Sequence, residues 1–313
     1  METFPDIPLN DWADTKATIH RYAQIVGKVR LGASIRRNHW WNVPFHLTGR
    51  GITTRPMGGL DDIPLFAIDF DFVDHKLVVN AIDGRSVAFP LAGHSVASFY
   101  RDLFAALDLL GIQITIRAHP FDLDDDIPFA EDITHMAYDP AMVTRYWQVL
   151  SQVAQVLECY AADFSGKTSP VHHFWHTFDI AVSRFSDKKV KQGPQIDPVT
   201  REAYSREVIS AGFWFGDQNM PEPAFYSYTA PEPPGLTEEP LRPSQAFWMP
   251  ARGSHLAVLR YSDARASADP LGTVLDFLHS AYQAGARRAG WDIEATYSPK
   301  GVTDPVVINE TSG

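Results

Sequence analysis

An internal repeat is the feature that most constrains how this sequence folds. When the chain is aligned with itself at a fixed offset, three residues of the first half fall on identical residues of the second: His39 on His173, Trp41 on Trp175, and Arg50 on Arg184. Each copy follows a long amphipathic stretch and is followed by strand patterns and a capped helix. Such self-similarity predicts a duplicated fold. The alternative is two unlike halves whose aromatic strands resemble one another by composition.

Apolar residues recur three and four positions apart over four long segments, which indicates amphipathic helices. The segments are residues 11–31, 95–110, 140–164 and 270–290. Asn10 or Asp11 is placed to cap the first helix and Ser95 the second, and an Asp-Pro pair opens each of the last two. Gly111 and Gly290 stand where a helix commonly ends in the left-handed conformation.

Strand patterns fill the rest of both halves. They cover residues 36–54, 65–71, 76–82, 86–91 and 112–117, then 171–185, 207–215, 224–230, 246–249 and 255–261. A polar loop is expected at 188–201. Asp83-Gly84 is a strong hairpin signal, so we expect antiparallel sheets. The predicted fold class is α+β, with two related halves that each contain a helix, an antiparallel sheet of about four strands, and a helix.

The predicted domains are an N-terminal half (1–117), an acidic, proline-punctuated connector (118–138), a C-terminal half (139–296) and a loose tail (297–313). An antiparallel sheet can leave one face uncovered by helices. We therefore expect the ligand site in a cleft between the two sheets.

Composition excludes several classes of partner. The chain has 27 basic and 38 acidic residues and a formal net charge of -11. Nucleic acids and anionic membranes are bound by basic surfaces, so neither is expected as a partner. The single cysteine, Cys159, is expected to be a buried, inert thiol. A signal peptide and an apolar run of about 18 residues are both missing, which favours a cytoplasmic protein.

Several strings of residues carry a family resemblance that extends from about Leu9 to Ala295. They are residues 12–15, 24–30, 38–41, 69–75, 169–175, 201–205 and 223–226. These strings resemble an uncharacterised bacterial family, the domain of unknown function with the number five-nine-nine-six. The resemblance implies a cytosolic bacterial protein and supplies no activity.

A histidine cluster is the first candidate for chemistry. On a continuous strand, His172 and His176 would share one face and His173 the other. Imidazoles with a carboxylate such as Asp179 suit a divalent metal, so His172, His176 and Asp179 are the candidate ligands and a divalent metal the candidate cofactor. Histidines packed among aromatic rings are the structural alternative.

Two aspartates alternate on a predicted strand, and Asp69 and Asp71 are therefore candidate acid–base groups or ligands for a hard cation. A solvated strand face is the alternative. The repeated Arg50 and Arg184 suit a carboxylate or phosphate, or else each pairs with an aspartate of its own sheet. No nucleotide-binding glycine loop or nucleophile elbow is present in the sequence.

The leading functional prediction is a small-molecule enzyme with an aromatic cleft lined by His, Asp and Arg. The candidate catalytic residues are His39, Asp69, Asp71, His173 and His176. The candidate substrate-binding residues are Trp41, Arg50, Trp175, Arg184 and Tyr204. One alternative is a non-catalytic binding protein for an aromatic or haem-like ligand. Another is a scaffold that binds a partner through the proline-rich residues 231–243. The sequence specifies no substrate or oligomeric state.

Overall fold

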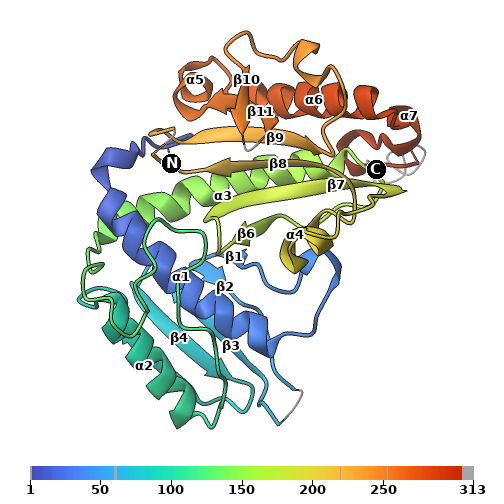
Figure 1. Cartoon of the computed structure of the whole chain (residues 1–313). Coiled ribbons are helices and arrows are strands. Elements are labelled where there is room, and N and C mark those ends of the chain that lie inside the picture. Colours follow the sequence, from blue (N-terminus) through green and yellow to red (C-terminus); the bar gives the residue numbers. More distant parts are fainter. Residues whose placement is uncertain (1, 60–61, 219, 252, 305–313) are drawn as a thin grey trace, which may run out of the picture. The chain divides into compact units, whose positions relative to one another are not determined.

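A computed structural model describes residues 2–59, 62–218, 220–251 and 253–304. The chain divides into two compact units (Figure 1). The N-terminal unit comprises Pro5–Ser151 and His172–Asp179, and the C-terminal unit comprises Met1–Phe4, Gln152–Val171 and Ile180–Gly313. One of the boundaries between the units therefore falls inside a long helix, α3 (Pro140–Ala162), and none falls in the acidic connector.

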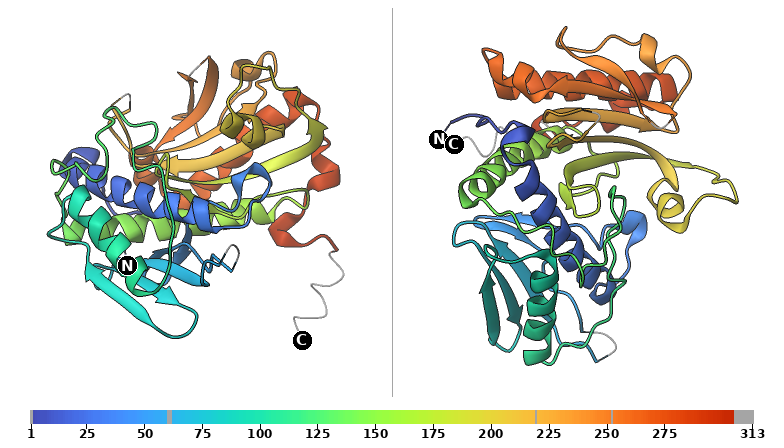
Figure 2. Two further views of the ribbon diagram at one scale, coloured as in Figure 1. Left: turned by 60° about the horizontal axis from the view of Figure 1, so that its bottom comes forward. Right: turned by 60° about the vertical axis from the view of Figure 1, so that its left-hand side comes forward.

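The N-terminal unit packs two helices on one face of an antiparallel sheet. The sheet has the order β1-β2-β3-β4-β5, formed by β1 (His46–Thr48), β2 (Gly51–Thr53), β3 (Phe66–Asp71), β4 (Lys76–Ala81) and β5 (Ser86–Pro90). The helices are α1 (Ala13–Ala33) and α2 (Val96–Leu109), which contact each other and lie on the same side of the sheet (Figure 2). Tyr22 of α1 stacks on Phe99 of α2, and Phe99 faces Phe70 of β3, so alternation in the strand directs its aromatic residues into this core.

The second sheet has the order β10-β11-β9-β8-β7-β6. Its strands are β6 (His172–Phe174), β7 (Asp179–Lys189), β8 (Arg206–Trp214), β9 (Ala224–Ala230), β10 (Phe247–Ala251) and β11 (Ser254–Arg260). Three short α-helices lie in the same part of the sequence: α4 (Pro198–Ala203), α5 (Tyr261–Ala266) and α7 (Ile293–Thr296).

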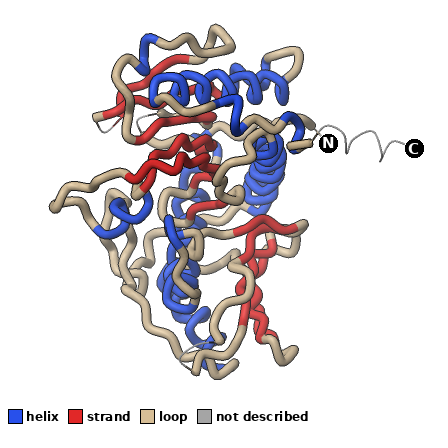
Figure 3. The backbone as a smooth tube through the Cα atoms, turned by 90° about the vertical axis from the view of Figure 1, so that its right-hand side faces the viewer, coloured by secondary structure: helices blue, strands red, loops and turns tan. Residues whose placement is uncertain are grey.

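Helix α6 (Pro270–Ala289) lies along β8, β9 and β11 in the C-terminal unit. Gly285 permits this close approach, because a Cβ added there would lie 2.0 Å from the hydroxyl of Thr229 on β9. Helices and strands form separate layers in each unit (Figure 3). The α+β class is thus confirmed, with five and six strands in place of about four. No helix of the described residues is long and apolar enough to cross a membrane.

Local signals predicted most helix ends correctly. The hydroxyl of Ser95 accepts a hydrogen bond from the Ser98 amide, and the Asp139 carboxylate accepts bonds from the first amides of α3. Gly111 and Gly290 both adopt positive φ at helix ends, at 74° and 66°. The expected cap at Asn10 or Asp11 is wrong, because Trp12 occupies that position and makes no side-chain capping bond.

The prediction of one strand over 36–54 is wrong. His39 and Trp40 have φ of 55° and 60°, which lies outside the extended region and produces a short 3-10 turn, Asn38–Trp40. Farther along, the chain reverses at Gly49 and Arg50, so the remaining residues form the two short strands β1 and β2.

The strand predicted over 171–185 is interrupted by a turn at 175–178, where Phe178 has a φ of 60°. No strand forms at 112–117. The segment 188–201 is only partly a loop, since Asp197 caps α4. Tyr297, at the start of the expected loose tail, forms a β-bridge with Phe164, and residues 305–313 lie outside the described residues. Cys159 is exposed, because α3 directs it away from the core.

The predicted duplication stays a prediction. Both halves run from a long helix through antiparallel strands to a capped helix, as expected. The strand orders differ, because β11 and not β10 lies beside β9 in the second sheet. The repeated arginines also have different surroundings: Arg50 is exposed at a turn, whereas Arg184 is buried within β7.

Gly27 provides a test of the N-terminal core. A Cβ added at Gly27 would lie 2.2 Å from the indole ring of Trp175, and that ring is buried. We expect Gly27→Ala to lower the free energy of unfolding by about 1–3 kcal/mol, the usual cost of overpacking a core. Urea denaturation measures this change. Gly49→Ala is the matched control, because nothing lies within 4 Å of a Cβ there. Equal stability of the two variants would contradict the packing described.

Candidate functional site

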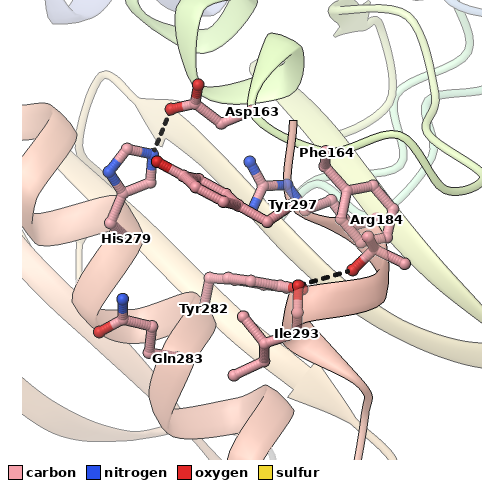
Figure 4. Close-up of a pocket in the computed structure, with 9 residues that line it drawn as sticks. Asp163, Phe164, Arg184, His279, Tyr282, Gln283, Ile293 and Tyr297 are labelled. Carbon is pink, nitrogen blue, oxygen red and sulfur yellow. Dashed lines mark hydrogen bonds and ion pairs between the residues drawn. The ribbon is translucent and has the colours of Figure 1, made fainter. Parts of the chain in front are cut away.

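The candidate site is a cavity of about 160 Å³ in the C-terminal unit (Figure 4). Strand β7 contributes Arg184, the chain after α3 contributes Asp163 and Phe164, α6 contributes His279, Tyr282 and Gln283, and α7 with the residue after it contributes Ile293, Thr296 and Tyr297. The ring of Tyr297 lies across the cavity with its hydroxyl end toward His279. Tyr297 is 60% exposed, so it lies on the solvent side of the cavity.

Arg184 is a buried cation held by aromatic rings. Its side chain is 1% exposed, and its guanidinium carbon lies 3.7 Å from the ring centroid of Tyr160 and 4.4 Å from that of Tyr282. One terminal nitrogen donates to the carbonyl oxygen of Tyr160. Cation–π contacts and this hydrogen bond offset part of the cost of removing the charge from water. No carboxylate forms an ion pair with Arg184 among the described residues.

Several buried polar atoms around Arg184 have no hydrogen-bond partner in the described part of the chain. They are Nε of Arg184 and the hydroxyl oxygens of Tyr160 and Tyr282. Buried polar groups are nearly always hydrogen-bonded, because an unsatisfied one costs about 1–3 kcal/mol. A cluster of such atoms beside a cavity is therefore the arrangement expected where a polar ligand binds.

His279 and Asp163 lie close together at the edge of this cavity. Nε2 of His279 lies 3.1 Å from a carboxylate oxygen of Asp163, but the two are not aligned for a hydrogen bond. The other oxygen of Asp163 accepts a hydrogen bond from the Lys300 amide, which fixes the carboxylate. Burial, followed by the charge of Arg184, lowers the pKa of His279, and Asp163 opposes that shift. His279 is therefore mainly neutral near pH 7 and is able to accept a proton.

The structure places only Arg184 of the predicted residues at this cavity. Tyr204, also in the C-terminal unit, does not line it, and its hydroxyl lies 3.1 Å from that of Tyr228. Asp163, His279 and Tyr297 were missed. His279 appears in the sequence only as a polar residue in an amphipathic helix, and Asp163 follows a helix as many surface residues do. No spacing links them, because α3 and α6 meet only in the tertiary fold.

The predicted histidines lie in the N-terminal unit, and His39, His172 and His173 are buried there. His173 is fully buried, and its Nε2 is hydrogen-bonded to the hydroxyl of Tyr146. Burial lowers the pKa of His173 and of His172 to about 3. His39 is buried in the 3-10 turn with Trp41 beside it, their rings 5.5 Å apart. Trp175 packs against Gly27.

The predicted metal ligands do not form one cluster. The turn at 175–178 separates His172, whose ring packs against His46, from His176, whose ring packs against Phe121. Asp179 accepts a hydrogen bond from the hydroxyl of Thr177. Over the described ranges, no three His, Cys, Asp or Glu side chains are grouped as a metal ion requires.

The predicted aspartates of β3 hold the sheet and its turn. Arg50 donates to Asp71 at 2.8 Å, and Asp71 also accepts hydrogen bonds from the amides of Val73 and Asp74. These bonds hold the pKa of Asp71 below its usual value against the opposing effect of burial. Asp69 accepts a hydrogen bond from Asn80. Arg50 thus pairs with an aspartate of its own sheet, which was the structural alternative.

The sequence matches one known protein family over nearly its whole length. A model described as a family of unknown function (DUF5996) matches residues 4–298. The chain belongs to this family. The match includes every residue that lines the Arg184 cavity. No curated protein and no solved structure matches the chain.

The buried histidines predict how stability depends on pH. Burial lowers the pKa of His20, His172 and His173 from 6.5 to about 3 in the folded protein. Because the unfolded chain takes up protons first, stability is complete above about pH 6.5 and falls as the pH drops toward 3. Each group contributes a slope of up to about 1.4 kcal/mol per pH unit.

Urea denaturation between pH 6.5 and 4.5 measures this dependence. We expect His172→Gln to reduce the slope, because the imidazole of His172 is buried in the folded protein. A free energy of unfolding that is constant over this range would contradict the burial of neutral histidines.

The pair at the cavity edge predicts a change in the titration of His279. Since the carboxylate of Asp163 raises the pKa of His279, we expect Asp163→Asn to lower that pKa further. Histidine side-chain NMR measures the shift. We expect Asp276→Asn, which removes a carboxylate outside the cavity, to lower the pKa of His279 as well. An unchanged pKa in Asp163→Asn would show that the two side chains do not interact.

Proposed function

We propose that this protein binds a small organic anion in the Arg184 cavity. The observation that carries the proposal is a buried guanidinium that lacks a carboxylate partner among the described residues and lines a cavity walled by aromatic rings. An anionic ligand would supply the missing charge and accept a hydrogen bond from Nε. Arginine is suited to carboxylates because its donors match their planar geometry.

The dimensions of the cavity limit the ligand. Drug-sized ligands occupy pockets of about 300–1,000 Å³, whereas an apolar cavity of about 150 Å³ holds a benzene molecule. A volume of about 160 Å³ therefore fits one ring bearing a carboxylate, or an aliphatic acid of similar size. A haem is too large for this cavity. Phe164, Tyr282 and Tyr297 would contact the faces and edges of a planar ligand.

Acid–base chemistry on the bound anion is the second candidate function. His279 favours it, because a largely neutral imidazole lies in the same cavity as the anion-binding arginine. In that case Arg184 would orient the substrate, His279 would take up or release a proton, and Asp163 would stabilise the imidazolium that forms. The residue types are those that the sequence predicted, namely His, Asp and Arg in an aromatic cavity. The residues themselves are different ones, apart from Arg184, and all belong to the C-terminal unit.

Thermal unfolding with matched probes tests the binding proposal. A ligand present at ten times its Kd stabilises the folded state by about 1.4 kcal/mol. We expect benzoate to raise the Tm by a few degrees, and benzamide, which has the same shape without the charge, to raise it far less. Acetate provides the charge without the ring and should also bind weakly.

Substitutions show whether benzoate binds in the Arg184 cavity. Arg184→Met should abolish the shift with benzoate, whereas Arg201→Gln, which changes an exposed arginine of the same unit, should retain it. If Arg184→Met does not fold, Tyr297→Ala serves instead, because this exposed residue is removable without loss of core packing. Equal responses to benzoate and benzamide, or full binding by both cavity variants, would reject the proposal.

A further inference from the structure

A group of arginines that form no ion pair with the described residues lies in the N-terminal unit. Arg30, in the last turn of α1, is 5% exposed, and its Nε has no hydrogen-bond partner among the described residues. The same holds for Nδ1 of His172, a residue that is 1% exposed. No ion pair neutralises Arg30 in the part of the chain that the structure describes. Its position at a helix C-terminus compensates only part of the cost of burial.

Three further segments converge on Arg30. After β2 the chain passes through Arg55 and returns to α1, where the amide of Gly58 donates to the carbonyl of Ala33 at 2.8 Å. Strand β1 carries His46, and the antiparallel β-bridge between Phe45 and His173 sets His172 beside it.

The rings of His46 and His172 are consequently 5.2 Å apart. The loop that carries Arg37 is tied to the end of α1, because the Asn42 side chain bonds both to the Arg37 amide and to the Ser34 hydroxyl. Arg37 and Arg55 are exposed, so they form the solvent side of this group, and Arg30 and His172 form its base.

Burial and, after it, mutual repulsion shift the pKa values of these residues. Burial lowers the pKa of Arg30 to about 10, and Arg55 adds to that effect. Burial also lowers the pKa of His46 to about 4, with Arg55 and Arg30 contributing. The pKa of His172, at about 3, is lowered by burial and then by His46 and the arginines. No carboxylate of the described residues is among the main causes of these three shifts, although the whole chain carries a net charge of -11.

We propose that Arg30, Arg55 and His172, with Arg37 and His46 at their margin, form a binding site for a phosphoryl group. The guanidiniums of Arg30, Arg37 and Arg55 provide three positive charges, which suits a dianion better than a monocarboxylate. The two neutral imidazoles each retain one N–H donor and complete the set of donors with little further charge. The ligand therefore differs from the carboxylate proposed for Arg184, and the residues belong to the other unit.

Isothermal titration calorimetry tests the site: inorganic phosphate is added to the protein in a buffer that otherwise contains no phosphate. We expect phosphate to bind at least tenfold more tightly than acetate. Arg55→Gln should weaken phosphate binding tenfold or more, and because Arg55 is exposed this variant should fold. Arg30→Gln should have a larger effect. Arg101→Gln, an exposed arginine of the same unit, should bind phosphate as the unaltered protein does.

Two further measurements identify where phosphate binds. Bound phosphate should raise the pKa of His46 and His172, as seen by histidine NMR, because a nearby anion favours the imidazolium. Arg184→Met should retain phosphate binding in full, which separates this site from the carboxylate cavity. The proposal is overturned if acetate binds as tightly as phosphate, if Arg55→Gln and Arg30→Gln both bind normally, or if the histidine titrations do not respond.

Discussion

Burial of positive charge that no carboxylate of the described residues neutralises is the physical constraint on which both proposed sites depend. A guanidinium removed from water has a desolvation cost of several kcal/mol that aromatic contacts and single carbonyl bonds only partly offset. Arg184 illustrates this with two tyrosine rings, one carbonyl and an unsatisfied Nε. Arg30 does so with a helix C-terminus and a second unsatisfied Nε. In both places an anion would compensate the charge. Both proposed sites are therefore inferred from buried arginines and not from sequence motifs.

The histidine cluster leads to a different conclusion. Its density in the sequence suggested metal binding, but the structure buries the imidazoles separately among aromatic rings. His173 contacts Phe45, Tyr146 and Phe178, and its low pKa keeps it neutral. A neutral imidazole in such surroundings packs like an aromatic residue with one hydrogen bond to satisfy. His172 differs from His173 because it faces a group of charged residues, and that difference follows from the alternation of side chains along β6.

Predictions from the sequence were accurate where the determining interaction is local. Ser95, Asp139 and Gly290 mark helix ends through bonds or backbone conformations within a few residues, and Asp83-Gly84 forms the expected hairpin turn. They were inaccurate where composition favoured a strand but the backbone turned, as at His39 and Phe178. An aromatic residue with positive φ is uncommon, so the pattern alone gave no indication of either turn. Of the residues that line the cavity, the sequence predicted only Arg184, since Asp163 and His279 come together through the packing of α6.

By itself, the sequence determined the four long helices and most of their ends, the antiparallel character of the sheets, the α+β class and the family. These properties follow from side-chain periodicity and short-range hydrogen bonds, which the order of residues specifies directly. Only the tertiary structure decided which charges are buried. Arg50 and Arg184 occupy equivalent positions in the predicted repeat, yet one is exposed beside Asp71 and the other is enclosed by tyrosines. Desolvation depends on every segment that packs around a group, and those segments come from distant parts of the chain.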